Sequence, residues 1–303
     1  MLTSELVRKT RLLEIFTRHL VNDTFAGRYQ AIFKGRGIEF EEVRPYSPGD
    51  EVRSIDWNVT ARMGEPYVKR YVEERELTVV LMVDASGSGE FGTFDRFKRE
   101  LAAELAAVLA FAATTSNDRV GLLIFTDSVE LFIPPRKGRR HVTRLIREML
   151  AFQPRGLGTD IALALDMINK VLKRRSIIFL ISDFLADPAG YSRPLFVTGR
   201  RHDVVAMDLN DPLEREIPDV GLLALEDAET GEVVWVDSGD PAWRRGFEDR
   251  VESLEDGKKQ AFASARVDRI RVATDRDYLP PLIAFFRRRS RRVARGVARP
   301  GLA

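Results

Sequence analysis

A run of mostly β-branched and aliphatic residues, 77–83, ends at Asp84 and is followed by Ser86 and Ser88. Such a continuous apolar run predicts a strand that is buried on both faces, as strands of parallel sheets are. Open sheets of this kind bind ligands at the carboxyl ends of their strands. Hard cations such as Mg²⁺ prefer oxygen ligands, and a tight turn can direct alternate side chains towards one point. The run therefore predicts an α/β fold with oxygen ligands beside Asp84.

Strand and helix patterns alternate from residue 77 to residue 288. The apolar spacing predicts strands at 120–125, 129–133, 177–181, 204–207 and 270–273, and helices at 94–115, at 139–151, after Thr159 and at 278–288. Residues 222–225 and 233–236 flank a turn-forming segment and predict a hairpin insertion near 219–237. This order predicts an α/β domain over 77–288, with a doubly wound, mostly parallel sheet and helices on both faces.

Two further segments flank this domain. Residues 1–76 begin with an amphipathic helix over 3–21 and continue with turn formers and short alternating pieces, which predicts a small N-terminal β-containing lobe. Five charged residues of this lobe are expected to form an internal ion-pair network, or alternatively a binding site: Arg44, Asp50, Arg53, Asp56 and Arg62. Tyr46 and Trp57 are expected to anchor the lobe on the α/β domain. Residues 289–303 form a basic, arginine-rich C-terminal tail.

Composition limits the classes of protein and of site. The 303 residues are 44% hydrophobic and 31% charged, which is typical of a soluble protein with a sizeable core. The sequence contains no cysteine, so disulfides, thiolate metal sites and cysteine nucleophiles are excluded. The longest apolar run, 105–113, is far shorter than the about 20 residues of a membrane-spanning helix. We therefore expect a cytoplasmic protein without a transmembrane segment.

Polar residues also stand at the ends of two later elements. Thr159 precedes a predicted helix, for which it is a plausible N-cap, and Asp183 follows the predicted strand 177–181. Asp84, Ser86 and Ser88 follow the first strand, so three separate ends offer oxygen ligands. The alternative is that these side chains only cap the helices that follow them. For Thr159 the two roles are compatible.

Three other functions of the same residues are disfavoured. Residues 87–92 match the dinucleotide-binding pattern G-x-G-x-x-G, but the acid nearest the required position, Glu104, lies within a predicted helix. Ser86 and Ser88 lack the flanking glycines of a Gly-x-Ser-x-Gly nucleophile elbow, and the chain has no P-loop motif. None of the histidines, His19, His141 and His202, lies next to these serines in the sequence. The chain offers no obvious catalytic base.

The order and context of the polar residues resemble the von Willebrand factor A fold and its metal-ion-dependent adhesion site. In that family the two serines bind the metal directly, and the threonine and the second aspartate lie at its edge, directly or through water. The resemblance covers roughly residues 77 to 210 and implies a site for Mg²⁺ or Mn²⁺ on five residues. These are Asp84, Ser86, Ser88, Thr159 and Asp183.

The N-terminal lobe carries a second resemblance. It contains the pattern Arg44-x-Tyr46-x-Pro48-Gly49-Asp50, followed by Arg53-x-Ile55-Asp56-Trp57 and Ala61-Arg62. This long, ungapped pattern is similar to the signature of the domain-of-unknown-function 58 family. That family couples such a lobe to a von Willebrand A-like domain, in an arrangement similar to proteins that act beside MoxR-type AAA+ ATPases.

We therefore expect a divalent-metal-dependent protein-interaction module that is not an enzyme. One or two protein carboxylates neutralise such a metal incompletely, so a Glu or Asp of a partner protein would complete its shell. The resemblance implies a MoxR-type ATPase or its client as partner, with this chain as an adaptor in assembling or activating another complex. Two alternatives remain: a metal-dependent hydrolase that uses the same pocket, and attachment to nucleic acid or a membrane surface through the arginine-rich tail. We favour the interaction module and expect no nucleic-acid partner.

Overall fold

The computed structural model describes residues 42–48, 50, 52, 55–70, 76–93 and 96–294, together with Tyr29, Ile32 and Phe33. Three sequence-based predictions lie outside these residues: the helix over 3–21, the alternating piece around Ile38 and Phe40, and the extended piece at Tyr71 and Val72. Arg53 of the expected ion-pair network also lies outside them.

A six-stranded sheet forms the centre of the structure, with the order β10-β7-β6-β3-β4-β5. The strands are β3 (Thr78–Asp84), β4 (Arg119–Phe125), β5 (Val129–Arg136), β6 (Ile177–Ser182), β7 (Asp203–Asn210) and β10 (Asp268–Ala273). Neighbouring strands from β10 to β4 run parallel, and only the edge pair β4–β5 of this sheet is antiparallel. The predicted doubly wound, mostly parallel sheet is confirmed.

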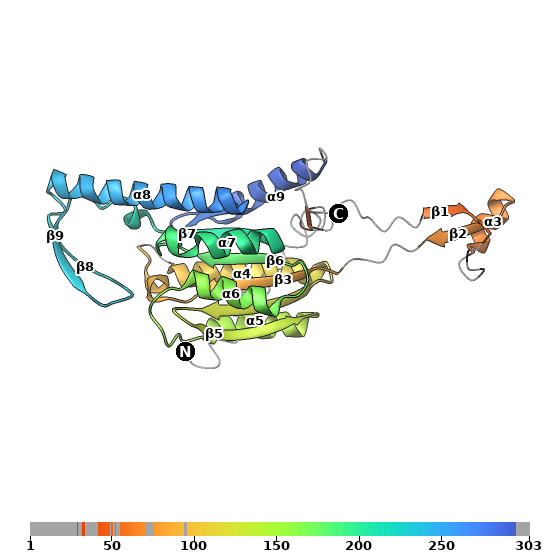
Figure 1. Ribbon diagram of the computed structural model, residues 1–303, viewed down its shortest axis with the longest axis horizontal. Coiled ribbons are helices and arrows are strands. Elements are labelled where there is room, and N and C mark those ends of the chain that lie inside the picture. The colour runs from red at the N-terminus through yellow and green to blue at the C-terminus, as the bar shows by residue number, and fades with distance from the viewer. Residues whose placement is uncertain are drawn as a thin grey trace.

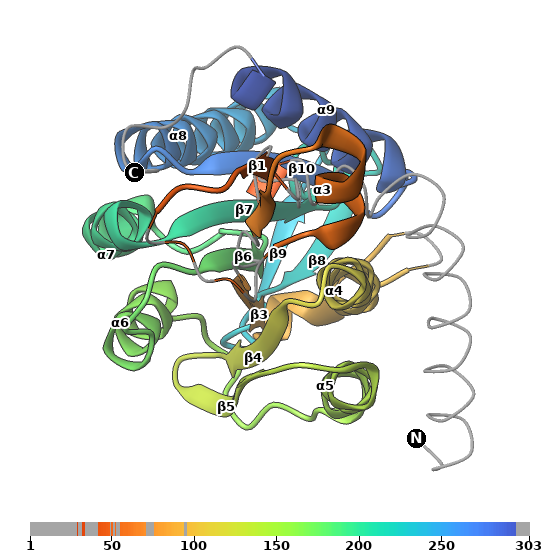
Figure 2. The same ribbon diagram turned by 90° about the vertical axis from the view of Figure 1, so that its right-hand side faces the viewer.

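Helices cover both faces of this sheet (Figure 2). One face carries α4 (Lys98–Thr115), α5 (Arg139–Ala151) and α9 (Leu279–Ala294), and the other carries α6 (Ile161–Val171), α7 (Pro188–Arg201) and α8 (Pro241–Ala265). Helices α7 and α8 are absent from the sequence-based expectations. Helix α7 contains Pro194, which weakens the helical signal, and only four residues of the 25-residue α8 are buried, so its apolar stripe is faint.

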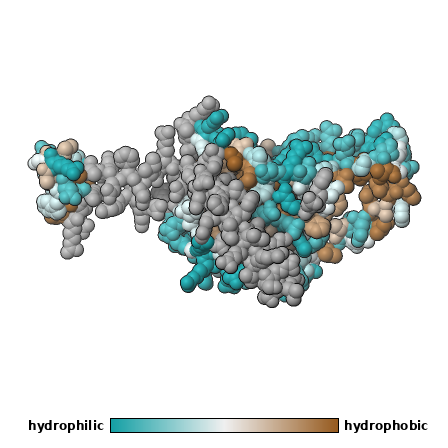
Figure 3. Space-filling view, turned by 180° about the vertical axis from the view of Figure 1, so that it is seen from behind, coloured by the Kyte–Doolittle hydropathy of each residue, from teal (hydrophilic) through white to brown (hydrophobic). Residues whose placement is uncertain are grey.

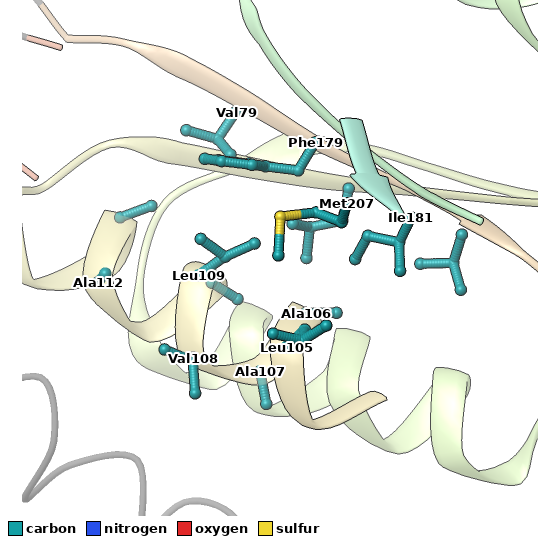
Figure 4. Close-up of a cluster of buried hydrophobic side chains, with 14 of the residues drawn as sticks. Val79, Leu105, Ala106, Ala107, Val108, Leu109, Ala112, Phe179, Ile181 and Met207 are labelled. Atoms are coloured by element: carbon teal, nitrogen blue, oxygen red, sulfur yellow. The ribbon is translucent and has the colours of Figure 1, made fainter. Parts of the chain in front are cut away.

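The first apolar run is buried on both faces, as its sequence predicts. Val79 and Leu81 of β3 face the helix layer that contains α4, whereas Val80 and Met82 face the layer that contains α6. Figure 4 shows the first of these two cores, where Leu105 and its neighbours on α4 lie against side chains of the sheet. Alanines fill most of the remaining buried positions of α4 and let its backbone approach the strands closely. This close contact fixes β3, and with it Asp84, in place.

The N-terminal lobe is built from β1 (Glu42–Pro45), α3 (Trp57–Met63) and β2 (Tyr67–Arg70), with β1 and β2 antiparallel. Three predicted network members have internal partners: Arg44 pairs with Asp50 at 2.6 Å, and Asp56 caps α3 through the backbone N–H groups of residues 58 and 59. The predicted anchoring role of Trp57 is wrong, because its side chain is 67% exposed. It stands at the first position of α3, a helix in which no residue is buried.

The hairpin of β8 (Leu222–Glu226) and β9 (Val233–Asp237) forms a separate two-stranded sheet. It lies between β7 and α8 in the chain and projects from the end of α8 (Figure 1). Hydrophobic side chains gather on its surface (Figure 3), including Leu222 and Trp235, which are both 67% exposed. Among the described residues, no helix is long and apolar enough to cross a membrane.

Candidate functional site

The parallel pairing of β3 with β6 brings two carboxylates to the same edge of the sheet. Val83 is in register with Ile181, so Asp84 and Asp183 both leave the carboxyl ends of neighbouring strands. Ser182 lies between them and donates from Oγ to Oδ2 of Asp84 at 2.6 Å. The resulting acidic edge lies where open parallel sheets place their ligand sites.

Ser86 and Ser88 complete this edge. The turn after β3 is fixed by Asp84, whose Oδ1 accepts the backbone N–H of Ser86 at 3.0 Å. The Oγ atoms of the two serines lie 3.0 Å apart, and the Ser88 hydroxyl helps to lower the pKa of Asp183. A cavity of about 10 Å³, which is close to the size needed by one water molecule, lies beside them. Its lining consists of Asp84, Ser86, Ser88, Gly89, Lys98, Arg99, Ala102, Ser182, Asp183 and Leu209.

Lys98, the first residue of α4, is the charged partner that the sequence analysis missed. Its side chain is only 1% exposed, and its Nζ lies 2.5 Å from Oδ2 of Asp183. The same ammonium pairs with Glu214, in the short helix η4 (Pro212–Glu214) after β7. Lys98 lies in a charged first turn, Lys-Arg-Glu, so its sequence context gives no sign that it is buried. The two acids that pair with it are far away in the sequence.

The two aspartates of the site differ in charge balance. Burial, followed by the negative charge of Asp183, raises the pKa of Asp84 from 3.8 to about 6. Burial also favours a higher pKa for Asp183, but the ammonium of Lys98 and the hydrogen bonds to the carboxylate together outweigh it and hold the pKa of Asp183 below its usual value. Asp183 therefore already has a counter-charge, whereas Asp84 is the group that gains from an added cation.

Asp183 does not cap the helix that follows it. Asp187 caps α7 and accepts the backbone N–H of Ala189 at 2.9 Å. Oδ1 of Asp183 accepts only the local N–H of Leu185, at 3.2 Å, among the hydrogen bonds recorded for the described residues. The helix-capping alternative therefore fails for Asp183, and its other oxygen faces Lys98 and the cavity.

Thr159 stands on the loop before α6 and is not among the residues that line the cavity. This loop is joined to the turn after β3, because Gly87 donates its N–H to the carbonyl of Leu157 at 2.8 Å. Asp160, not Thr159, caps α6 and accepts the N–H of Leu163 at 2.8 Å. The predicted N-cap is therefore one residue too early, because Asp160 still has a non-helical backbone. The Thr159 hydroxyl therefore does not cap α6 and has a different hydrogen-bond partner.

The partner of this hydroxyl comes from the β8–β9 hairpin. Thr159 donates from Oγ1 to Oε1 of Glu229 at 2.7 Å. Glu229 belongs to the turn between β8 and β9, which is 70 residues further along the chain. The turn also approaches Gly87, where an added Cβ would lie only 2.1 Å from the carbonyl oxygen of Ala228. The tip of the hairpin thus lies against the two loops that carry the predicted site residues.

The described histidines take no part in this edge. His141 hydrogen-bonds the carbonyl of Val120 at 2.8 Å, and His202 is buried at the amino end of β7, where it accepts the N–H of Ser176. Burial lowers the pKa of His202 to about 4, so it is neutral near pH 7. No histidine lines the cavity within the part of the chain that the structure describes.

The donor set is of the type that a hard cation uses. Asp84 and Asp183 supply carboxylate oxygens, and Ser86 and Ser88 supply hydroxyl oxygens, around a space of suitable size. No group of three or more His, Cys, Asp or Glu side chains is arranged to hold a metal among the described residues. A metal at this edge would therefore depend on the serine hydroxyls and on water for the rest of its shell.

The sheet and its acidic edge define a doubly wound α/β protein with an oxygen-lined site at the ends of two neighbouring strands. The chain belongs to the DUF58 family, since the family described as "Protein of unknown function DUF58" matches residues 42–256. The chain is 35% identical over 289 residues to the uncharacterized protein Mb1516 of Mycobacterium bovis. The aligned region covers 95% of this chain and 90% of that protein. The family resemblance expected from the lobe is confirmed.

Several solved structures resemble this chain. The conserved hypothetical protein BatB from Bacteroides thetaiotaomicron is 15% identical, with a TM-score of 0.47, over 72% of this chain and 99% of that one. The SpRpn10 VWA domain is 13% identical, with a TM-score of 0.37, over 69% of this chain and 93% of that one. At these identities the likeness concerns the arrangement of the backbone and carries no function across.

Proposed function

We propose that this protein is a divalent-metal-dependent docking module that works by binding and not by catalysis. Mg²⁺, or Mn²⁺, would be held by Asp84, Ser86, Ser88 and Asp183, with Thr159 at the edge of the site. The bound cation would supply an electrophilic centre that attracts an acidic side chain of a partner protein. The observation that carries this proposal is the convergence of four oxygen-bearing side chains on one water-sized cavity.

The charge balance at this edge supports the proposal. Asp84, Asp183 and Glu214 bring three carboxylates together, and Lys98 supplies one ammonium to the last two of them. The other cation that lines the cavity, Arg99, pairs with Glu90. Mutual repulsion of buried carboxylates is relieved when a cation binds, so the cavity favours a positive ion over a neutral ligand.

The partner would be a protein that presents a Glu or Asp side chain. Two protein carboxylates, one of which is already paired with Lys98, leave a divalent ion short of neutrality, so an incoming carboxylate gains electrostatic energy. The family resemblance further suggests a MoxR-type AAA+ ATPase or its client, with this chain as an adaptor. This choice of partner is supported by the resemblance alone.

Two observations disfavour the alternative functions. No histidine lines the cavity in the described part of the chain, so a hydrolase in this pocket would have to use a carboxylate such as Asp84, which the proposed metal site already employs, as its general base. The arginine-rich end is partly used within the molecule, because Arg289 of α9 pairs with Asp203 and Asp268. An arginine that is engaged in this way is less available to phosphate groups.

An affinity capture experiment tests the proposed function. Immobilised wild type and Asp84→Ala would each be exposed to native lysate with Mg²⁺ or with a chelator, and retained proteins would be identified. We expect a defined set that requires both Mg²⁺ and Asp84, including an AAA+ ATPase. Ser116→Ala, a buried serine at the far end of α4, is the control and should retain the same set. The proposal would be refuted if wild type retained the same proteins with chelator as with Mg²⁺, and if Asp84→Ala retained the same proteins as wild type.

A further inference from the structure

We propose that the β8–β9 hairpin occupies the docking site of its own chain, and that Glu229 takes the place of the partner's acidic residue until the partner displaces it. The inference rests on the proposed function above. Its starting point is the hydrogen bond from Thr159 Oγ1 to Glu229 Oε1, at 2.7 Å. A glutamate carboxylate is the chemical group that the docking site is proposed to receive.

The turn that carries Glu229 is held in one shape. Oδ1 of Asp227 accepts the backbone N–H groups of Glu229 and Thr230 at 2.8 and 3.1 Å. Gly231 closes the turn with a positive φ of 71° and donates its N–H to the carbonyl of Asp227 at 2.7 Å. The backbone on both sides of Glu229 is therefore ordered before any ligand binds, which lowers the entropic cost of holding its carboxylate in place.

The backbone of the tip makes a second contact with the site. Gly87 lies between Ser86 and Ser88, and the space that its side chain would fill is taken by the carbonyl of Ala228. A Cβ there would lie 2.1 Å from that oxygen, so only glycine permits this approach. The tip therefore covers the serine turn through Ala228 and reaches the threonine loop through Glu229.

The strands of the hairpin, in contrast, are not part of the central sheet and leave many of their side chains exposed. Their sheet is separate from the central sheet, and Leu222, Val233 and Trp235 are more than half exposed. Figure 3 shows a hydrophobic patch on the surface of this part of the molecule. The opposite face, which carries Leu223, Leu225 and Val236, is only partly buried. A two-stranded hairpin with so little packing is only marginally stable by itself, so release of the tip requires few contacts to break.

This arrangement makes docking competitive. While the hairpin tip is in place, a partner must displace an internal carboxylate that is tethered at high effective concentration. The apparent affinity for a partner is then lower than the affinity of the open site by the fraction of molecules that are open. A partner with a stronger acidic ligand, or one that also binds the exposed hairpin, would replace the internal ligand.

Hydrogen exchange at the hairpin tip, with and without Mg²⁺, tests this inference. The variants are Glu229→Gln and its matched control Glu232→Gln, which changes an exposed glutamate of the same turn. Without metal, we expect amides 227–232 to exchange at least about threefold faster in Glu229→Gln than in wild type, since the charged carboxylate acceptor is replaced by a neutral amide oxygen that holds the Thr159 hydroxyl more weakly. With Mg²⁺, we expect exchange at the tip to slow in wild type and in Glu232→Gln, and not in Glu229→Gln.

Calorimetric Mg²⁺ titrations on the same proteins separate the possible failures. If wild type does not bind Mg²⁺, the proposed function is wrong and this inference falls with it. If Mg²⁺ binds in an Asp84-dependent manner and the two glutamate variants exchange equally, this inference alone is wrong. A difference between the variants that is seen only without Mg²⁺ would make Glu229 a purely structural residue and would also overturn the inference.

Discussion

The Nζ atom of Lys98 lies 2.5 Å from Oδ2 of Asp183, and both side chains are buried at the edge of the sheet. The pair neutralises one of the two aspartates that follow β3 and β6 and leaves Asp84 without an equivalent partner. The two aspartates of the candidate site therefore differ: Asp183 has an ammonium partner within the protein, whereas Asp84 would gain a comparable partner only from a bound cation. This inequality leads to the first two predictions.

Replacing Lys98 should destabilise the protein strongly. Lys98→Met keeps the length of the side chain but leaves Asp183 and Glu214 buried without their ammonium. We expect a loss of about 3–5 kcal/mol in the free energy of unfolding, measured by urea denaturation. Lys259→Met is the control, because Lys259 forms an exposed pair with Asp256, and it should cost less than about 1 kcal/mol. Equal losses in the two variants would contradict the role given to Lys98.

The raised pKa of Asp84 predicts a pH dependence in the metal-free protein. The folded protein binds a proton at Asp84 up to about pH 6, whereas the unfolded chain releases it near the ordinary value of 3.8. Stability should therefore fall as the pH rises from about 4 to 6, and Asp84→Asn should remove this loss. We expect Asp84→Asn to be more stable than wild type by about 1–3 kcal/mol at pH 7 in chelator.

Denaturation curves at several pH values measure this effect. Asp84→Asn and wild type should have similar stability near pH 4 and should diverge as the pH approaches 6 and above. Mg²⁺ binding by wild type should weaken below about pH 6, because the cation competes with the proton for Asp84. A difference between the two proteins that does not change with pH would exclude Asp84 as the titrating group.

Gly87 should be required for the contact between the hairpin tip and the turn after β3. In Gly87→Ala the new Cβ would overlap the carbonyl oxygen of Ala228, so the tip must move away. Gly89→Ala is the matched control, because its Cβ would only touch Cβ of Arg99 at an ordinary 3.5 Å. Limited proteolysis should cut 227–232 faster in Gly87→Ala than in Gly89→Ala. The same rate in both would mean that the hairpin does not rest on this turn.

Arg289 should act as a structural residue despite its place in a basic run. It lies over the ring of Phe33 and pairs with Asp203 and Asp268, and its side chain is 11% exposed. Arg289→Ala should lower the free energy of unfolding by about 2–4 kcal/mol. Arg288→Ala removes a neighbouring exposed arginine and should change it by less than about 0.5 kcal/mol. Thermal unfolding of the two variants measures the difference, and equal melting temperatures would contradict it.

The sequence predicts the central sheet well because its strands are long apolar runs that are buried on both faces. The same property places Asp84 and Asp183, since both directly follow such runs. The sequence does not reveal Lys98 as a partner of Asp183, because 85 residues separate them. Glu229 is equally hidden, because a glutamate in a hairpin turn is ordinary by itself. Long-range contacts of this kind depend on strand order and loop placement, which residue patterns do not encode.

Helix boundaries show a similar limit. Helix α9 ends at Ala294, six residues beyond the expected end at residue 288, because Arg289 and Arg292 have acidic partners on β7 and β10. A run of arginines without nearby acids resembles a solvated tail in sequence. Helices α7 and α8 are missing from the expectations because Pro194 interrupts one pattern and exposure weakens the other.

A calorimetric titration of the wild type with Mg²⁺ tests the central claim most directly. The account predicts saturable binding of one ion that Asp84→Ala abolishes and that the double variant Ser86→Ala/Ser88→Ala weakens at least about tenfold, because each change removes oxygen ligands. Glu216→Ala, a control that changes an exposed acid outside the cavity lining, should bind as wild type does. Equal heats for wild type and Asp84→Ala would contradict the account.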